Sequence, residues 1–118
     1  MLQFEELKLR LIAHEEELAN LAEALGLEKM KTEIANLEEQ QAQEGFWDDI
    51  QNSQKVLQRT SVLKNKVSAY ERLKADYDDA LVMIELADEE EDESLVDECT
   101  QGVEKFEKTL MHKHFQLS

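Results

Sequence analysis

The chain has 118 residues and a mass of 13.7 kDa, with 28 acidic against 13 basic side chains and a net charge of -15. A surface this negative repels phosphate backbones, so we expect no strong nucleic-acid binding by the chain on its own. The single cysteine, Cys99, excludes an internal disulfide and favours a reducing, cytoplasmic compartment. No apolar run approaches the ~20 residues that span a bilayer, so we expect no membrane partner.

The composition predicts helices. About half of the residues are Ala, Glu, Lys, Leu or Arg, which is typical of long helices and coiled coils. Leu, Ile, Val and Phe make up about a quarter of the chain, more than disordered chains of high charge contain. Because proline is absent and glycine is scarce, the turns that a sheet requires are missing. We therefore predict an all-α fold, an extended antiparallel bundle of about four helices with coiled-coil-like seams.

Two helices are expected in the first part of the chain. Apolar residues at spacings of three and four predict a helix over 3–25, with His14 at one position of its seam and Gly26 as its stop. The same spacing predicts a second helix over 27–44, which Gly45 ends. The short connection leaves two arrangements open, a hairpin and a kinked pair.

A long third helix is expected after an aromatic corner. Phe46 and Trp47 interrupt the pattern, and Asp48 and Asp49 follow, of which Asp49 suits the N-cap of a new helix. Its apolar stripe, which predicts a helix over 48–88, consists of Val56, Leu63, Val67, Tyr70, Tyr77, Leu81 and Ile84. At 1.5 Å per residue such a helix is a rod of roughly 60 Å, so the architecture must be extended.

Six consecutive acids, residues 88–93, predict a solvated turn before a last helix over 93–113. The run lacks the alternating oxygen ligands and central glycine of a calcium loop. Asp92 suits the N-cap of the last helix, and Cys99 on its seam is expected to be a small buried apolar residue. The apolar residues after Lys113 have nothing left to pack on, which suggests a chain that is part of something larger.

The remaining polar residues predict no chemistry. His14 has no second histidine or cysteine at ligand spacing, and we expect it at a helix interface. His112 and His114 do not share a helix face, so we expect them at a frayed helix end rather than at a metal. No nucleophile elbow and no phosphate-binding glycine loop occurs. We expect a protein that is not an enzyme and needs no cofactor or metal.

One stretch departs from the overall charge. Residues 50–70 contain no acid but four cations, of which Lys55, Arg59 and Lys66 fall within about 40° of one another on the predicted helix. Two interpretations stay open: ion pairs with Glu-rich neighbouring helices, and contact with RNA phosphate or an acidic protein. Trp47 is similarly either a plug at the end of a core or an exposed docking anchor. The candidate partner contacts are therefore Lys55, Arg59, Lys66 and Trp47.

Several blocks resemble a known family. Gly45-Phe46-Trp47-Asp48-Asp49, then Gln54-Lys55-Val56-Leu57, and later Ile84-Glu85-Leu86-Ala87-Asp88-Glu89-Glu90 are similar in order and spacing to the N-terminal region of the bacterial peptide chain release factor 2 family. The resemblance is strong from about Leu27 and looser before it. Ile50 stands where that family often has a proline.

The resemblance implies a role in ending translation. Members of the family recognise the stop codons UGA and UAA on the ribosome through Ser-Pro-Phe and release the peptide through Gly-Gly-Gln. This chain has no proline and no adjacent glycines, so neither motif occurs and no functional residue transfers. The resemblance therefore implies that residues 1–118 form one helical N-terminal domain of a larger factor, which reaches the stalk base of the large ribosomal subunit. The alternative is a free-standing acidic coiled-coil adaptor or chaperone-like interaction protein.

Overall fold

The computed structural model describes the backbone of residues 1–117 and the side chains of residues 1–113. That backbone contains α-helices and two short 3-10 helices and no strand, which confirms the predicted all-α fold. The elements in chain order are α1 (Leu2–Ile12), α2 (Glu15–Leu25), α3 (Leu27–Gln41), η1 (Phe46–Asp48), α4 (Ile50–Glu89), η2 (Glu93–Leu95) and α5 (Val96–Leu117).

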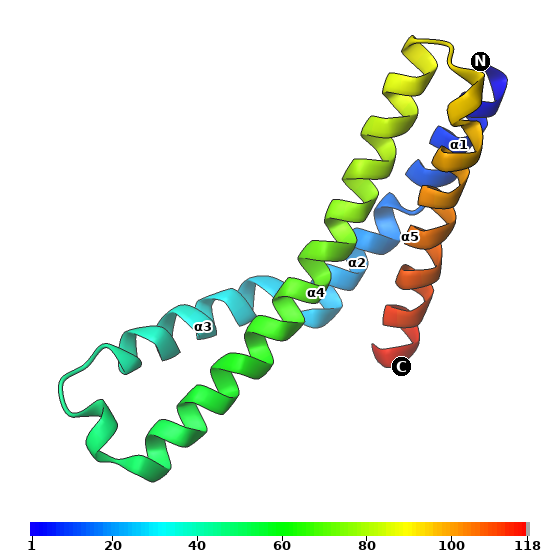
Figure 1. The fold of residues 1–118 in the computed structure, drawn as a ribbon. Coiled ribbons are helices and arrows are strands. Elements are labelled where there is room, and N and C mark those ends of the chain that lie inside the picture. The colour runs from blue at the N-terminus through cyan, green and yellow to red at the C-terminus, as the bar shows by residue number, and fades with distance from the viewer. Residues whose placement is uncertain (118) are drawn as a thin grey trace.

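The molecule is a rod, 63 × 29 × 18 Å along its principal axes, and α4 runs along its whole length (Figure 1). Helices α1, α2 and α3 follow one another along α4 in the opposite direction, and α5 returns beside α1. Helix α4 is antiparallel to its neighbours as predicted, but α1 and α5 run the same way. We call α3, η1 and residues 50–70 the arm, and α1, α2, residues 71–89 and α5 the body.

The main core lies in the body. Phe4, Leu73, Val103 and Phe106 are among its fully buried side chains, and Phe106 packs edge-on against Tyr77 with ring centroids 5.5 Å apart. In contrast, α3 has no fully buried side chain, and it meets α4 through half-buried apolar residues. The body is therefore a packed unit of α1, α2, α5 and the second half of α4, and the arm is a thinner two-helix extension of it.

The buried seam of α4 shifts where the arm joins the body. Its members follow one another at intervals of three and four: Ser53, Val56, Thr60, Leu63, Val67, Tyr70, Leu73, Tyr77, Ala80, Ile84 and Ala87. Two successive intervals of three surround Tyr70, and this change of phase moves the seam around the helix as its partner changes. Tyr70 marks the junction, where its hydroxyl donates to the Leu18 carbonyl oxygen over 3.3 Å. The predicted seam member Leu81 is only half-buried, and Leu73 and Ala80 take the core positions.

The prediction of one continuous helix over 3–25 is wrong, because Ala13 and His14 interrupt the helix and divide it into α1 and α2. The His14 N–H bonds to the Leu11 carbonyl over 3.0 Å, a tighter turn than an α-helix makes. Neither glycine nor proline marks this break, but residues 15–17 are all glutamates, which suit the positive end of the new helix dipole.

Glycines end the next two segments as expected. Gly26 adopts φ 67° between α2 and α3, a left-handed conformation that glycine reaches without strain. Because α3 continues along α4, this junction is the kinked pair and not the hairpin. The predicted helix 27–44 ends earlier, at Gln41, and Gly45 turns the chain with φ 83°.

The long helix has its predicted cap. The Asn52 N–H donates to Asp49 Oδ1 over 3.1 Å, which satisfies one of the free donors at the start of α4. The helix begins at Ile50 rather than at residue 48, because residues 46–48 form the separate turn η1. Its end lies at Glu89, one residue beyond the predicted 48–88.

The acidic run forms the predicted turn, although its first two residues still belong to α4. Glu91 has a positive φ of 52°, and Asp92 Oδ1 accepts the Ser94 N–H over 3.1 Å. The predicted last helix over 93–113 is thus divided into η2 and α5. Cys99 is buried in the body core as predicted.

Candidate partner-contact surface

The acid-free stretch forms the first half of α4. Residues 50–70 contribute their seam to α3 and turn the remaining side chains outward from the arm. The candidate cations lie along this segment, and Trp47 lies in η1 just before it. All four candidate residues therefore belong to the arm, outside the body core.

Arg59 pairs with the neighbouring helix. Its Nε donates to Glu33 Oε2 over 2.7 Å and its Nη2 donates to Oε1 over 3.1 Å, a bidentate contact between α4 and α3. The hydrogen bonds from Arg59 lower the pKa of the Glu33 carboxyl below its ordinary value of 4.5. Lys64 also pairs with α3, through a single contact of 2.8 Å between its Nζ and Glu38 Oε2. For Arg59 and Lys64, the structure therefore agrees with the interpretation of ion pairs to a Glu-rich neighbouring helix.

Lys55 and Lys66 behave differently. Both side chains are exposed, and neither forms an ion pair with any residue whose side chain the structure describes. Their spacing of eleven residues places them on the same flank of α4, about 16 Å apart along its axis. Two of the three aligned cations are therefore available to a partner.

The two aromatic residues of η1 have opposite environments. Phe46 is buried and closes the end of the arm, whereas Trp47 is 61% exposed. Their rings meet edge to face with centroids 4.9 Å apart. Phe46 is the plug, and Trp47 has the exposure that a docking anchor requires.

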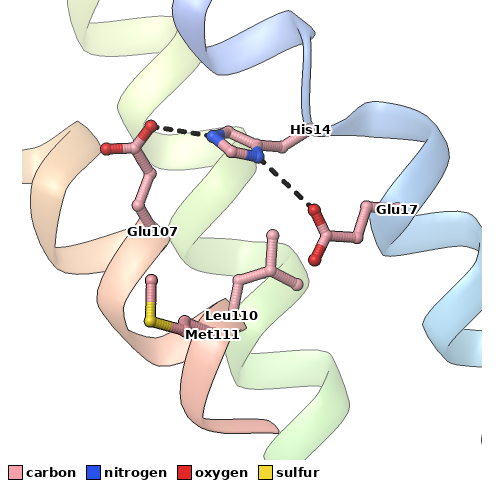
Figure 2. A pocket seen from close by; sticks show the side chains of 5 residues that line it. All are labelled: His14, Glu17, Glu107, Leu110 and Met111. Carbon is pink, nitrogen blue, oxygen red and sulfur yellow. Dashed lines mark hydrogen bonds and ion pairs between the residues drawn. The ribbon is translucent and has the colours of Figure 1, made fainter. Parts of the chain in front are cut away.

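A second polar cluster lies in the body, where sequence reasoning expected only an interface histidine. Figure 2 shows His14 between two carboxylates, with Nε2 2.7 Å from Glu107 Oε2 and Nδ1 3.7 Å from Glu17 Oε2. Leu110 and Met111 complete the lining of this shallow pocket of about 360 Å³.

Arg10 binds the same carboxylate. Its Nε lies 3.1 Å from Glu107 Oε2, and its Nη2 also donates to the carboxylate. The hydrogen bonds from Arg10 lower the pKa of the Glu107 carboxyl, and the hydrogen bond with His14 lowers it further by a smaller amount. The His14 ring also packs edge-on against Phe106, with centroids 5.9 Å apart. The cluster ties α1 and the α1–α2 break to α5, and its partners are about a hundred residues apart in sequence.

Two further features of the described residues concern the cysteine and metal binding. Burial raises the pKa of the Cys99 thiol, which disfavours a reactive thiolate. Among the described residues, no group of three His, Cys, Asp or Glu side chains is placed to hold a metal ion. The His114 side chain, half of the predicted frayed-end pair, lies outside the described residues. Within residues 1–117, no helix is both long and apolar enough to cross a membrane.

Comparison with known proteins agrees with the resemblance read from the aromatic and acidic blocks. Residues 30–117 match the family described as PCRF domain, which covers well over half of the chain. The chain belongs to the PCRF domain family.

Two relatives from different organisms carry the name of a release factor. The chain is 36% identical over 93 residues to "Peptide chain release factor 2" of Acidothermus cellulolyticus, across 79% of this chain and 25% of that protein. It is 30% identical over 116 residues to the protein of the same name from Staphylococcus saprophyticus, across 98% of this chain and 31% of that protein. The PCRF chain therefore spans between a quarter and a third of the length of these relatives. No solved structure matches it.

Proposed function

We propose that this chain is the helical N-terminal accessory domain of a translation release factor that acts at UGA and UAA stop codons in the cytoplasm. The observation that carries the proposal is the match of residues 30–117 to the PCRF domain, together with similarity to release factor 2 proteins over nearly the whole chain. The domain itself contributes no catalytic residue in this proposal, because Gly-Gly-Gln and Ser-Pro-Phe do not occur in it.

The domain acts by contact with the ribosome. Its extended shape separates the arm from the body core, so the arm can reach a site that a globular domain of this mass would not. We propose that it reaches the stalk base of the large subunit through the surface around Trp47, Lys55, Arg59 and Lys66. Since Arg59 is already paired with Glu33, Lys55 and Lys66 are the cations that support such contact.

The test begins with the gene. We expect the native reading frame to continue beyond Ser118 and to encode Gly-Gly-Gln, and we expect the complete gene product to release peptides from purified ribosomes at UGA and UAA but not at UAG. A variant that lacks residues 1–118 should bind ribosomes more weakly. A matched variant with Gly-Gly-Gln changed to Gly-Ala-Gln should bind normally and release nothing.

Two results would contradict the proposal. One is a native stop codon directly after Ser118, which would favour the free-standing acidic adaptor. The other is a complete gene product that neither pellets with ribosomes nor releases peptides.

A further inference from the structure

The side of α4 that faces away from α3 lacks negative charge over residues 50–70. The exposed residues on this side, all within residues 50–68 of α4, are Ile50, Gln51, Gln54, Lys55, Leu57, Gln58, Ser61, Val62, Asn65, Lys66 and Ser68. We call this set the arm face. It extends for about 30 Å along the helix and contains amides, hydroxyls, apolar groups and two cations, in a chain whose net charge is -15.

The second half of the same helix has a different exposed surface. Four acids are exposed there: Asp78, Asp79, Glu85 and Glu89. Exposed apolar side chains such as Val82 lie among them. The absence of acids is thus confined to the first half of α4 and does not follow from helix formation or solubility, which would favour acids equally in both halves of the helix.

Exposed apolar side chains accompany the cations of the arm face. Ile50 is 68% exposed, Val62 is 40% exposed, and Trp47 adds an exposed indole at the end of the arm. Phosphate groups gain nothing from contact with Ile or Val side chains, and two unpaired cations neutralise too few phosphates for stable RNA binding. Apolar groups bordered by cations and amides are instead typical of a surface that binds protein.

Charge complementarity indicates the kind of partner. Lys55 and Lys66 border the arm face on one flank, so a partner with carboxylates at the rim of an apolar patch would meet them. The exposed acids of the body and of α3 would repel the same partner, which restricts docking to the arm face.

From this we infer that the arm face is a docking surface for a protein that presents an apolar patch rimmed with carboxylates. The inference rests on the proposed function, in which this partner is a protein of the ribosome. It adds to that function the face, the side chains and the chemistry of the contact.

Site-specific photo-cross-linking tests the face. The complete gene product would carry p-benzoylphenylalanine at position 62 or, as a matched control, at position 82, since both positions are exposed valines of α4. Each variant would be bound to purified ribosomes stopped at UGA, irradiated, and treated with ribonuclease or protease. We expect position 62 to form a cross-link that resists ribonuclease and is sensitive to protease. Its yield should be about tenfold above that of position 82, because position 62 lies within the proposed interface, where solvent is excluded, and position 82 lies outside it.

Charge reversal tests the chemistry. Lys55→Glu/Lys66→Glu should lower the cross-link yield from position 62 by about tenfold, because the new carboxylates would face those of the partner. Lys105→Glu/Lys108→Glu changes the net charge equally on exposed positions of α5 and should leave the yield within about twofold.

Each remaining outcome has a distinct meaning. A factor that pellets with ribosomes but cross-links equally from positions 62 and 82, or not at all, overturns the inference and leaves the proposed function intact. Cross-links that ribonuclease removes show an RNA partner and overturn it as well. A factor that does not bind ribosomes overturns both proposals.

Discussion

Truncation of Leu73 tests whether the body core carries the stability of the rod. Leu73 is 1% exposed and lies on α4 among the core side chains of α1 and α5. Leu→Ala changes at fully buried positions cost about 2–5 kcal/mol, since they remove apolar contacts and leave a cavity. We expect Leu73→Ala to lower the free energy of unfolding by about 3 kcal/mol.

Leu81→Ala is the matched control on the same helix. Because Leu81 lies at the edge of the core and is only partly buried, its truncation removes less buried apolar surface, and we expect a cost of about 1 kcal/mol. The measurement is urea unfolding followed by circular dichroism at 222 nm, with thermal melts in parallel. For a chain of this size, Leu73→Ala should lower Tm by roughly 10 °C and Leu81→Ala by roughly 4 °C. Equal losses, or a larger loss for Leu81→Ala, would refute the shift of the seam at the junction of arm and body.

Other substitutions test local features. Glu107→Gln should lower Tm at pH 7. The hydrogen bonds of Arg10, and to a lesser degree those of His14, lower the pKa of the Glu107 carboxyl, so its ionised form stabilises the folded state above pH 4.5. The wild type loses this stabilisation as the pH falls below 4.5 and the carboxylate takes up a proton, so the Tm difference between wild type and variant should shrink there. In urea titrations, Asp49→Ala should cost about 1 kcal/mol through loss of the helix cap, whereas Asp48→Ala beside it should cost under about 0.5 kcal/mol. Gly102→Ala should raise the free energy of unfolding by about 0.5–1 kcal/mol, because alanine favours the helical conformation of α5 and its methyl group has no atom within 4 Å to clash with. Gly26→Ala should lower it by about 1–2 kcal/mol because φ is 67°.

The features that the sequence predicted correctly depend on local chemistry. The cap at Asp49 and the turn at Gly26 are properties of short segments, and both occur in the structure. The break at His14 was missed because no local signal requires it. At the break, His14 contacts Glu107, 93 residues away, and no periodicity within α1 or α2 contains that information.

The candidate site was predictable as a region but not residue by residue. The angles around a helix place Lys55, Arg59 and Lys66 together, yet they do not say on which flank α3 lies. That position decides that Arg59 meets Glu33 while the other two cations stay unpaired. Likewise, the turn at Gly45 decides which of the two neighbouring aromatic residues is buried.

The continuity of α4 explains how a thin arm can hold a defined surface. Helix α3 has 15 residues and no fully buried side chain, and helices of that length are marginal in water without strong packing. Helix α4 contains no glycine or proline between Ile50 and Glu89, and its second half is fixed in the body core. Order in the body is therefore transmitted along one uninterrupted helix into the arm. Because the main core lies outside the arm, side chains on the arm face can adapt to a partner at little cost to folding, whereas the seam of α4 cannot.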